Sequence, residues 1–192
     1  MNIFYLHEEP QKCAYEHCDK HVVKMIIEYA QLMSTAHRVL DGELFFTLSK
    51  NNRKIKRYKL PDERDDKLML AVHENHPSNI WLRQSDENYK WLWQMWFHLN
   101  REYTYRYGKT HSCMRLLMDL IHTPNNIPSG KFTPPTPAMP EECKIPGDVV
   151  GSYRKYYIMK KNRFATWKNR VPPKWYAEGL IEHLGGTVAN DQ

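Results

Sequence analysis

The sequence predicts a mainly α protein, folded as a compact multi-helix single domain. Three observations favour this fold class. Long stretches free of proline and glycine carry apolar residues at three- and four-residue steps, which is the helical pattern. The 192 residues suffice to bury a core, and a hydrophobic content of 41% beside a charged content of 26% is typical of globular proteins. We expect one domain over 1–185, a basic β-hairpin insertion at about 43–60, a Pro-rich loop at about 123–147 and a tail at 186–192.

Net charge and cysteine usage narrow the protein class. The formal charge is +6 and the pI is about 9.0, which favours an anionic partner such as DNA. The four cysteines show no spacing typical of a small secreted domain, and no run of 18 apolar residues occurs. We therefore expect a cytoplasmic monomer with reduced thiols, no membrane association and no cofactor.

The stretch from Cys18 to Leu40 is predicted to be the central helix, ended by Gly42. Its apolar positions follow helical steps and leave only a narrow polar strip. The apolar residues are Val22, Val23, Ile26, Ile27, Tyr29, Ala30, Met33, Ala36 and Leu40, and the strip holds His17, His21, Lys24, Glu28, Gln31, Thr35 and Arg38. A largely buried helix would turn such a strip toward a cleft or a partner, whereas an ordinary surface helix would show it to water.

A two-stranded ribbon is predicted between Phe45 and Leu60, turning at Asn51-Asn52. It carries six cations: Lys50, Arg53, Lys54, Lys56, Arg57 and Lys59. Lysines that guard a solvated edge strand are one interpretation, and a ribbon that grips phosphates is the other.

The remaining elements are predicted in chain order. A short helix covers 62–73, a long core helix covers 78–108, and a third helix capped by Thr110 runs to Ile121. The buried face of this third helix is expected to comprise Met114, Leu117, Met118 and Ile121. Seven prolines exclude regular structure from 123–147, so an ordered functional loop is expected there. Asp148 is expected to cap the next helix, and Pro172-Pro173 to begin the last one, which ends at Gly185.

Several common types of site are disfavoured. Cys13, His17 and His21 recur every four residues, but the outer two would lie about 12 Å apart on a helix, too far for one metal ion. The chain contains no GxSxG motif and no Gly-rich phosphate loop. A hydrolase with a serine nucleophile elbow and a nucleotide-triphosphate motor are therefore both disfavoured.

The stretch 153–170 alternates aromatic and cationic residues. Cations bind phosphates and rings stack on exposed bases, so this pattern is typical of a nucleic-acid surface. An equally favoured interpretation is a helix whose aromatic side chains pack in the core and whose lysines are solvated. The residues are Tyr153, Arg154, Lys155, Tyr156, Tyr157, Lys160, Lys161, Arg163, Trp167, Lys168 and Arg170.

Three short motifs resemble the pyrimidine-dimer DNA glycosylase/AP-lyase family of T4-type bacteriophages. They are the N-terminal MNI, the helix CDKHVVKMIIE, and ATWKNR near the C-terminus, with IPSG upstream. The resemblance implies that the Met1 α-amine is the nucleophile and that Glu28, seven residues after His21, is the essential acid. It further implies a DNA substrate and action in the cytoplasm of an infected bacterial host. Tyr29-Ala30-Gln31 follow Glu28 where the family has Leu-Pro-Arg, so the target base stays open.

The chemistry implied by this resemblance defines the predicted site. Glu28 would stabilise the developing cation and move protons, while a positive His21 and Lys24 would keep it ionised. The catalytic residues are thus Met1, Glu28 and His21. The predicted DNA-binding residues are Asn2, Lys24, Arg38, His76, Arg83, Arg163, Trp167, Lys168 and Arg170. Two alternatives stay open: a group-transfer enzyme that acts on modified thymine in DNA, and a non-catalytic DNA-binding accessory protein.

Overall fold

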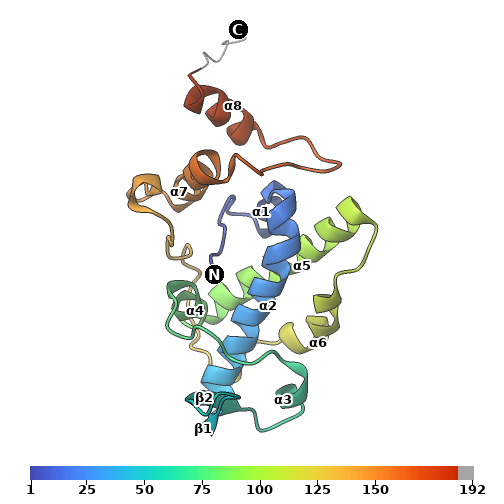
Figure 1. Ribbon diagram of the computed structural model, residues 1–192, viewed down its shortest axis with the longest axis vertical. Helices are drawn as coiled ribbons and strands as arrows, with labels where there is room; N and C mark the ends of the chain where they lie inside the picture. The colour runs from blue at the N-terminus through green and yellow to red at the C-terminus, as the bar shows by residue number, and fades with distance from the viewer. Residues whose placement is uncertain (186–192) are drawn as a thin grey trace.

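The computed structural model describes residues 1–185, and the predicted tail 186–192 lies outside them. The described residues form a mainly α protein with eight α-helices and a single two-stranded antiparallel sheet, as predicted. Helix α2, Asp19–Asp41, runs through the middle of the molecule (Figure 1). The sheet lies at one end of α2, and α7 and α8 lie at the other. Within residues 1–185, no helix combines the length and apolar character that a membrane crossing requires.

Helix α2 forms where the sequence lacks helix breakers, and Gly42 ends it by donating its N–H to the carbonyl of Arg38. Two details of the prediction are wrong. His17 precedes the helix, since it is the C-cap of the short α1, Pro10–Glu16. Val23 and Ile27 are exposed rather than part of the core, because they lie on the side of α2 that no other element covers.

The predicted long helix over 78–108 is two helices. Pro77–Leu82 forms α4 and Asp86–Tyr107 forms α5. The chain breaks between them because each has its own N-cap: His76 Nδ1 accepts from the Ser78 N–H, and Ser85 Oγ accepts from the Asn88 N–H. Helix α5 packs on α1 and α2. The Trp96 indole of α5 stabilises the contact with α2 by donating to the carbonyl of Ile26 at 2.9 Å.

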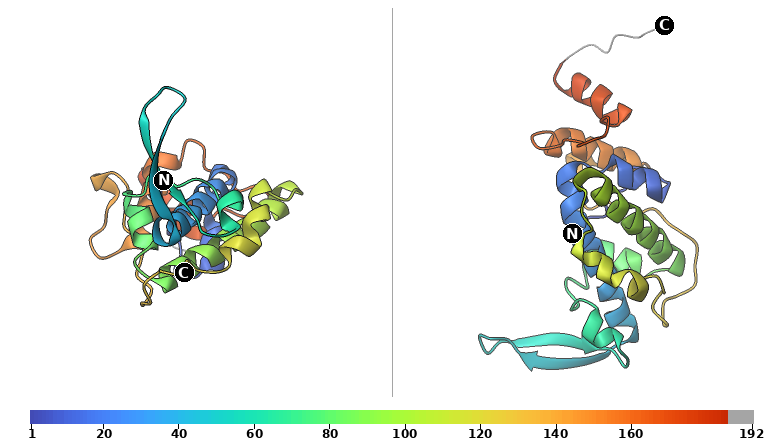
Figure 2. Two further views of the ribbon diagram at one scale, coloured as in Figure 1. Left: turned by 90° about the horizontal axis from the view of Figure 1, so that it is seen from below. Right: turned by 90° about the vertical axis from the view of Figure 1, so that its right-hand side faces the viewer.

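The predicted ribbon is confirmed. Strand β1, Glu43–Leu48, pairs in antiparallel register with β2, Lys54–Lys59. We call residues 43–59 the basic ribbon. It projects from the body on the same side as the N-terminus (Figure 2). The helix that follows, α3, covers only Arg64–Lys67, because the carbonyls of Leu68 and Met69 bind the Arg38 guanidinium instead of continuing the helix.

The third predicted helix is a 3₁₀ turn, Ser112–Leu116, followed by α6, Leu117–Leu120. His111, not Thr110, caps it. Its predicted buried face is also wrong: Cys113, Leu116 and Leu120 are buried, whereas Met118 and Ile121 are exposed. The 3₁₀ geometry shifts the side chains around the axis relative to an α-helix, which explains the different face.

The Pro-rich loop is ordered and wraps the body, with one 3₁₀ turn at Glu141–Cys143. Polar side chains hold it in place. The Asp41 carboxylate accepts the N–H groups of Asn125 and Asn126, and the Trp81 indole donates to the carbonyl of Thr133 at 2.8 Å.

The loop leads into α7, Val149–Tyr156, capped by Asp148 as predicted. A π-helical turn, Tyr157–Lys161, extends α7, and the last helix, α8, covers Lys174–His183. These elements close over the N-terminal segment from above (Figure 1).

Candidate active site

The first six residues form an extended segment that lies between α2, α4 and α7. Ile3, Phe4, Tyr5 and Leu6 are buried, so the segment is part of the core. The Arg154 guanidinium binds the Leu6 carbonyl at 2.9 Å, and Ser78 Oγ lies 3.4 Å from the Met1 carbonyl. The position of Met1 is thus fixed by contacts with two helices distant in sequence.

A chain of buried hydrogen bonds aligns this segment with α2. The Phe4 N–H donates to the Tyr29 hydroxyl at 3.1 Å, which pairs with His17 Nε2 at 3.1 Å. His17 Nδ1 lies 2.7 Å from the carbonyl of Cys13, so Nδ1 donates and Nε2 accepts. Burial lowers the pKa of His17 to about 4, which keeps it neutral in this role. Tyr29, one of the positions that departs from the resembled family, therefore holds the N-terminal segment beside Glu28.

The N-terminal segment and α2 line a cavity of about 200 Å³, which we call the N-terminal cavity. It brings together five of the predicted site residues: Met1, Asn2, His21, Lys24 and Glu28. Phe4, Met25, Tyr156 and Lys161 complete its lining.

Glu28 is the carboxylate of this cavity. Its side chain is only 18% exposed, and its ion pair with the Lys24 ammonium spans 3.2 Å across one helical turn. Lys161 adds a second ammonium to the lining, 4.5 Å from the centre of the Tyr156 ring. The cavity therefore combines the chain terminus, one carboxylate, two lysines and an aromatic ring.

His21 lines the cavity but does not have the charge predicted for it. Its ring stacks on Phe4 with centroids 4.1 Å apart, and Nδ1 lies 2.5 Å from the Tyr157 hydroxyl. Burial lowers the pKa of His21 to about 2, and the neighbouring positive charges of Lys161 and Lys24 act in the same direction. The prediction that a positive His21 keeps Glu28 ionised is therefore wrong. The charge beside Glu28 comes from Lys24.

His76 does not line the N-terminal cavity, but it lies near two of its groups. Burial lowers its pKa, the positive chain terminus lowers it further, and Glu28 opposes this shift, so both groups lie within electrostatic reach of His76. The same histidine lines a second cavity of about 460 Å³. That cavity is bounded by Lys56 and Tyr58 of the basic ribbon and by residues 71–76. His76 thus lines the cavity beside the ribbon and also lies within electrostatic reach of the chain terminus and Glu28.

Arg38 is not available to DNA, and the prediction for it is wrong. Its side chain is buried and all five of its N–H groups are bound within the protein. They donate to the carbonyls of Tyr58, Asp65, Leu68 and Met69 and to the Asp65 carboxylate, at 2.7–2.9 Å. Arg38 therefore anchors the base of the ribbon. Arg83 is half-buried and donates to the carbonyl of Glu74 at 2.7 Å, outside the lining of the N-terminal cavity.

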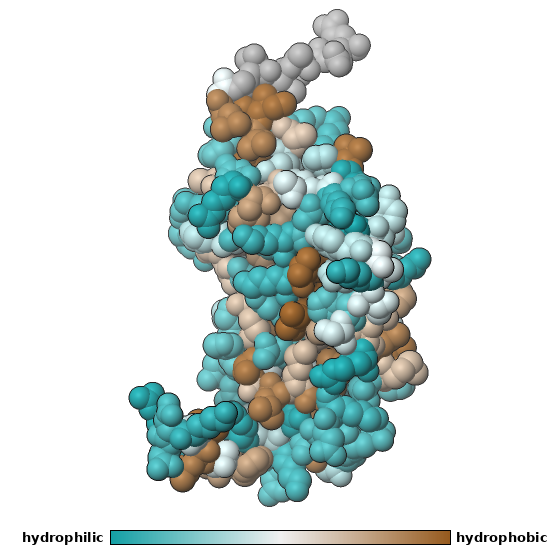
Figure 3. All heavy atoms as spheres, turned by 45° about the vertical axis from the view of Figure 1, so that its right-hand side comes forward, coloured by the Kyte–Doolittle hydropathy of each residue, from teal (hydrophilic) through white to brown (hydrophobic). Residues whose placement is uncertain are grey.

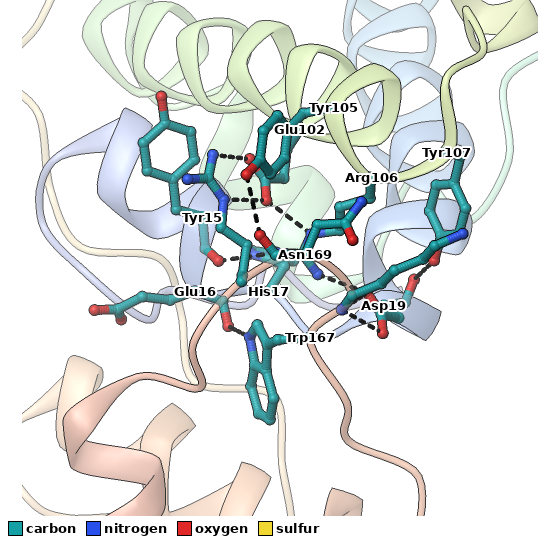
Figure 4. Close-up of polar contacts among 12 residues, drawn as sticks. Tyr15, Glu16, His17, Asp19, Glu102, Tyr105, Arg106, Tyr107, Trp167 and Asn169 are labelled. Carbon is teal, nitrogen blue, oxygen red and sulfur yellow. Dashed lines mark hydrogen bonds and ion pairs between the residues drawn. The ribbon is translucent and has the colours of Figure 1, made fainter.

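The ATWKNR motif, residues 165–170, forms the C-terminal segment, and it is bound to the body of the protein (Figure 4). Asp19 of α2 accepts from the Thr166 hydroxyl at 2.8 Å and from the Lys168 N–H at 2.9 Å. The same carboxylate pairs with Arg106 of α5 at 2.9 Å. Asp19 thereby connects two of the motifs that the sequence singles out.

Trp167 and Arg170, both predicted to contact DNA, have structural contacts within the protein. Trp167 is buried, and its indole donates to the carbonyl of Glu16 at 3.1 Å. Arg170 binds both carboxylate oxygens of the fully buried Glu102, at 2.9 and 2.8 Å, and its guanidinium lies over the rings of Tyr15 and Tyr105. Trp167 is therefore enclosed, whereas the Arg170 side chain remains 32% exposed and its predicted contact with DNA stays a prediction. Arg163 and Lys168 are exposed, and their predicted contact with DNA stays a prediction.

Four lining residues were not predicted as site residues: Phe4, Met25, Tyr156 and Lys161. Tyr156 and Lys161 belong to the basic-aromatic stretch, but their spacing of five residues does not indicate a shared helical face. The π-helical turn at Tyr157–Lys161 widens the helix by one residue per turn and brings both to the cavity. Within the described range 1–185, no group of three His, Cys, Asp or Glu side chains has the geometry of a metal site.

Comparisons of the chain with protein-family models, with curated proteins and with solved structures found no match. The resemblance to the pyrimidine-dimer glycosylase/AP-lyases therefore remains a prediction based on three short motifs.

Proposed function

We propose that this protein is a DNA glycosylase/AP-lyase that acts on a damaged or modified pyrimidine, as a cytoplasmic monomer without a cofactor. The observation that carries the proposal is the N-terminal cavity itself. It joins Met1 and Glu28, the two groups that an amine-based lyase needs, beside two lysines suited to a DNA backbone.

The proposed reaction begins when the target nucleotide is extruded from the duplex, which is least costly for a damaged base. The lone pair of the Met1 α-amine forms a bond to the sugar C1′. The C1′–N bond to the base breaks, and its electron pair leaves with the base, which takes up a proton. The nitrogen then gives up one proton, and its electron pair forms the C1′=N bond while the C1′–O4′ bond breaks. O4′ keeps the electrons of that bond and takes up a proton, which leaves a protonated Schiff base between Met1 and C1′. As a class, α-amines lose a proton about two to three pH units below lysine amines, which favours the terminus as nucleophile.

Glu28 has two roles in this proposal. Its negative charge stabilises the cation that develops at C1′, and its oxygens move protons between the amine, the sugar and the departing base. In the lyase step, a proton leaves C2′, its bonding electrons form the C2′–C3′ double bond, and the 3′ phosphate departs. The shielding of Glu28 from solvent strengthens both effects, since electrostatic interactions grow as water is excluded.

The other lining residues have supporting roles. Lys24 and Lys161 bind the phosphates that flank the extruded nucleotide. The exposed part of the Tyr156 ring offers a surface on which a base can stack. Neutral His21 positions Phe4 and donates or accepts a hydrogen bond through its second nitrogen.

A group-transfer enzyme that acts on modified thymine is the second candidate, favoured by the two ammonium groups at the cavity, which suit a pyrophosphate leaving group. The two reactions can be distinguished by whether they need a free amine at the N-terminus. Acetylation of the Met1 amine would abolish the lyase reaction and leave group transfer intact. A non-catalytic DNA-binding protein would retain its whole function in Glu28→Gln.

Borohydride trapping tests the proposal. A duplex with one abasic site, incubated with the protein and sodium borohydride, is expected to give a covalent protein–DNA complex by gel electrophoresis. A matched reaction with an undamaged duplex is expected to give none. Absence of a complex with the abasic duplex would reject the lyase mechanism.

A further inference from the structure

The basic ribbon exposes apolar side chains that contribute nothing to the core. The exposed apolar side chains all belong to β1: Leu44, Phe45, Phe46 and Leu48 are 46%, 43%, 56% and 63% exposed. A strand normally alternates polar and apolar residues so that its apolar side packs on something. Such a cluster on a projecting element marks an interaction surface. It is visible as brown side chains among teal ones at the lower left of Figure 3.

The strand register divides these residues between two faces. Leu44, Phe46 and Leu48 pair directly with Tyr58, Lys56 and Lys54, so all six share one face, which we call the wedge face. The Lys54 ammonium lies 4.3 Å from the centre of the Phe46 ring. Apolar tips are thus placed directly beside cations.

The wedge face reaches the cavity that His76 also lines. Lys56 and Tyr58 line the cavity of about 460 Å³, and both bind the Glu74 carboxylate, Tyr58 at 2.6 Å. The Arg38 guanidinium fixes the base of the ribbon by binding the Tyr58 carbonyl. The base is therefore held rigidly, whereas the outer half, with Phe46 and Leu48, extends away from the body (Figure 2).

Charge decides which partner fits this face. The ribbon has six cations and a single carboxylate, Glu43. Duplex DNA offers a dense row of phosphates, and a two-stranded ribbon can enter a groove and insert apolar side chains between base steps. A lipid surface would also accept apolar side chains and cations, but a duplex also accounts for the ribbon projecting on the same side of the molecule as the N-terminus, where the proposed function places DNA.

We propose that the basic ribbon is a DNA-bending wedge, which inserts Phe46 and Leu48 between base pairs while its lysines and arginines bind the flanking phosphates. Kinking the duplex beside the target unstacks the neighbouring bases and eases extrusion into the N-terminal cavity. This inference rests on the proposed function for the nature of its ligand, but it requires no chemical step.

DNA bending measured by energy transfer tests the wedge. The probe is a 30-base-pair duplex labelled at both ends, with a central tetrahydrofuran abasic analogue that cannot form a Schiff base. The full-length protein is expected to shorten the end-to-end distance. Phe46→Ala/Leu48→Ala is expected to abolish the shortening and to weaken binding about tenfold, because inserted side chains make the bend favourable. Its salt dependence should stay unchanged, since every cation is retained.

Two variants control for folding and chemistry. Met118→Ala, at a comparably exposed apolar side chain of α6, should bend DNA like the parent. Phe46→Leu, which keeps an apolar tip, should retain most of the bend. The proposal is overturned if the double variant bends the duplex fully, or if it loses only binding to phosphatidylglycerol vesicles. Bending without borohydride trapping would retain the wedge and reject the lyase.

Discussion

The N-terminal cavity and the C-terminal segment both bring carboxylates and cations together, but these groups are accessible in the cavity and enclosed by internal partners at the segment. In the cavity, Glu28 has one ion-pair partner, a lysine that is itself largely exposed. Where the C-terminal segment meets α5, Glu102 of α5 is fully buried between the guanidinium groups of Arg106 and Arg170. A carboxylate with accessible cations around it can respond to a substrate, whereas one enclosed by internal partners holds the fold together. The availability of polar groups, rather than their number, separates the two regions.

The largest contrast is expected between two carboxylate variants. Glu28→Gln should reduce the rate of cleavage at an abasic site by about 10²–10⁴-fold, since it removes the proposed proton-transfer group. Single-turnover cleavage of an abasic duplex measures the effect. Binding to the tetrahydrofuran duplex should change little. Glu8→Gln, at an exposed acid of the same end of the chain, is the control and should cleave normally. A fully active Glu28→Gln would remove Glu28 from the mechanism.

Glu102→Gln should instead lower stability, by about 3–5 kcal/mol, because it leaves the buried Arg106 without its closest counter-charge, 2.7 Å away. Urea denaturation measures the loss. Glu87→Gln lies on the same helix at a half-exposed site and should change stability by less than about 0.5 kcal/mol. Equal effects of the two variants would contradict the structural role of the Glu102 network.

The pH dependence of stability should include a contribution from the N-terminal region, beside that of His37, whose pKa burial lowers to about 4. His17 and His21 have pKa values lowered to about 4 and about 2 by burial, against 6.5 in the unfolded chain. Below pH 6.5 these histidines become protonated in the unfolded state, whereas they stay neutral in the folded state until the pH nears their lowered pKa values. The free energy of unfolding should therefore fall by about 1.4 kcal/mol per pH unit for each histidine, from about pH 6 down to pH 4.

Urea denaturation between pH 7 and pH 4.5 gives this slope. His21→Gln should make this slope shallower by the contribution of one histidine. This change in slope is expected however much the substitution alters the free energy of unfolding at pH 7. His183→Gln, at an exposed position, should leave the slope as it is. A slope unaffected by His21→Gln would show that this histidine is protonated in the folded protein.

The smallest contrast concerns two lysines. Lys161→Ala should weaken DNA binding a few-fold and reduce the salt dependence by about 0.9 in log–log slope, as expected for one lost phosphate contact. Lys168→Ala should have a smaller effect, because Lys168 does not line the N-terminal cavity and its ammonium lies 5.3 Å from the centre of the Tyr107 ring. Fluorescence anisotropy at several salt concentrations measures both. An equal reduction by Lys168→Ala would extend the DNA contact to the C-terminal segment.

Residue patterns predicted the elements better than they predicted the roles of side chains. Apolar periodicity identified α2 and the core of α5, and turn residues identified the ribbon, because both signals are local. The break between α4 and α5 escaped prediction, since His76 and Ser85 act as caps only when neighbouring backbone groups point at them. Local patterns alone do not distinguish a cap from a residue inside a helix.

The candidate site shows the same limit. Met1, Asn2, His21, Lys24 and Glu28 were predicted together and do line one cavity. Arg38 lies on the same predicted strip, yet carbonyls from residues 58–69 enclose it. Whether a cation on a helix faces a cavity or a turn depends on segments far away in sequence. Helical spacing predicts only which residues share a face.

Mapping the borohydride adduct tests the central claim, that the Met1 α-amine is the nucleophile, most directly. Trypsin should release residues 1–12, MNIFYLHEEPQK, whose only other amine, on Lys12, must be unmodified for cleavage there. Mass spectrometry is predicted to find the DNA remnant on this peptide, at residue 1. An adduct on Lys24 or Lys161, with the 1–12 peptide unmodified, would contradict the claim.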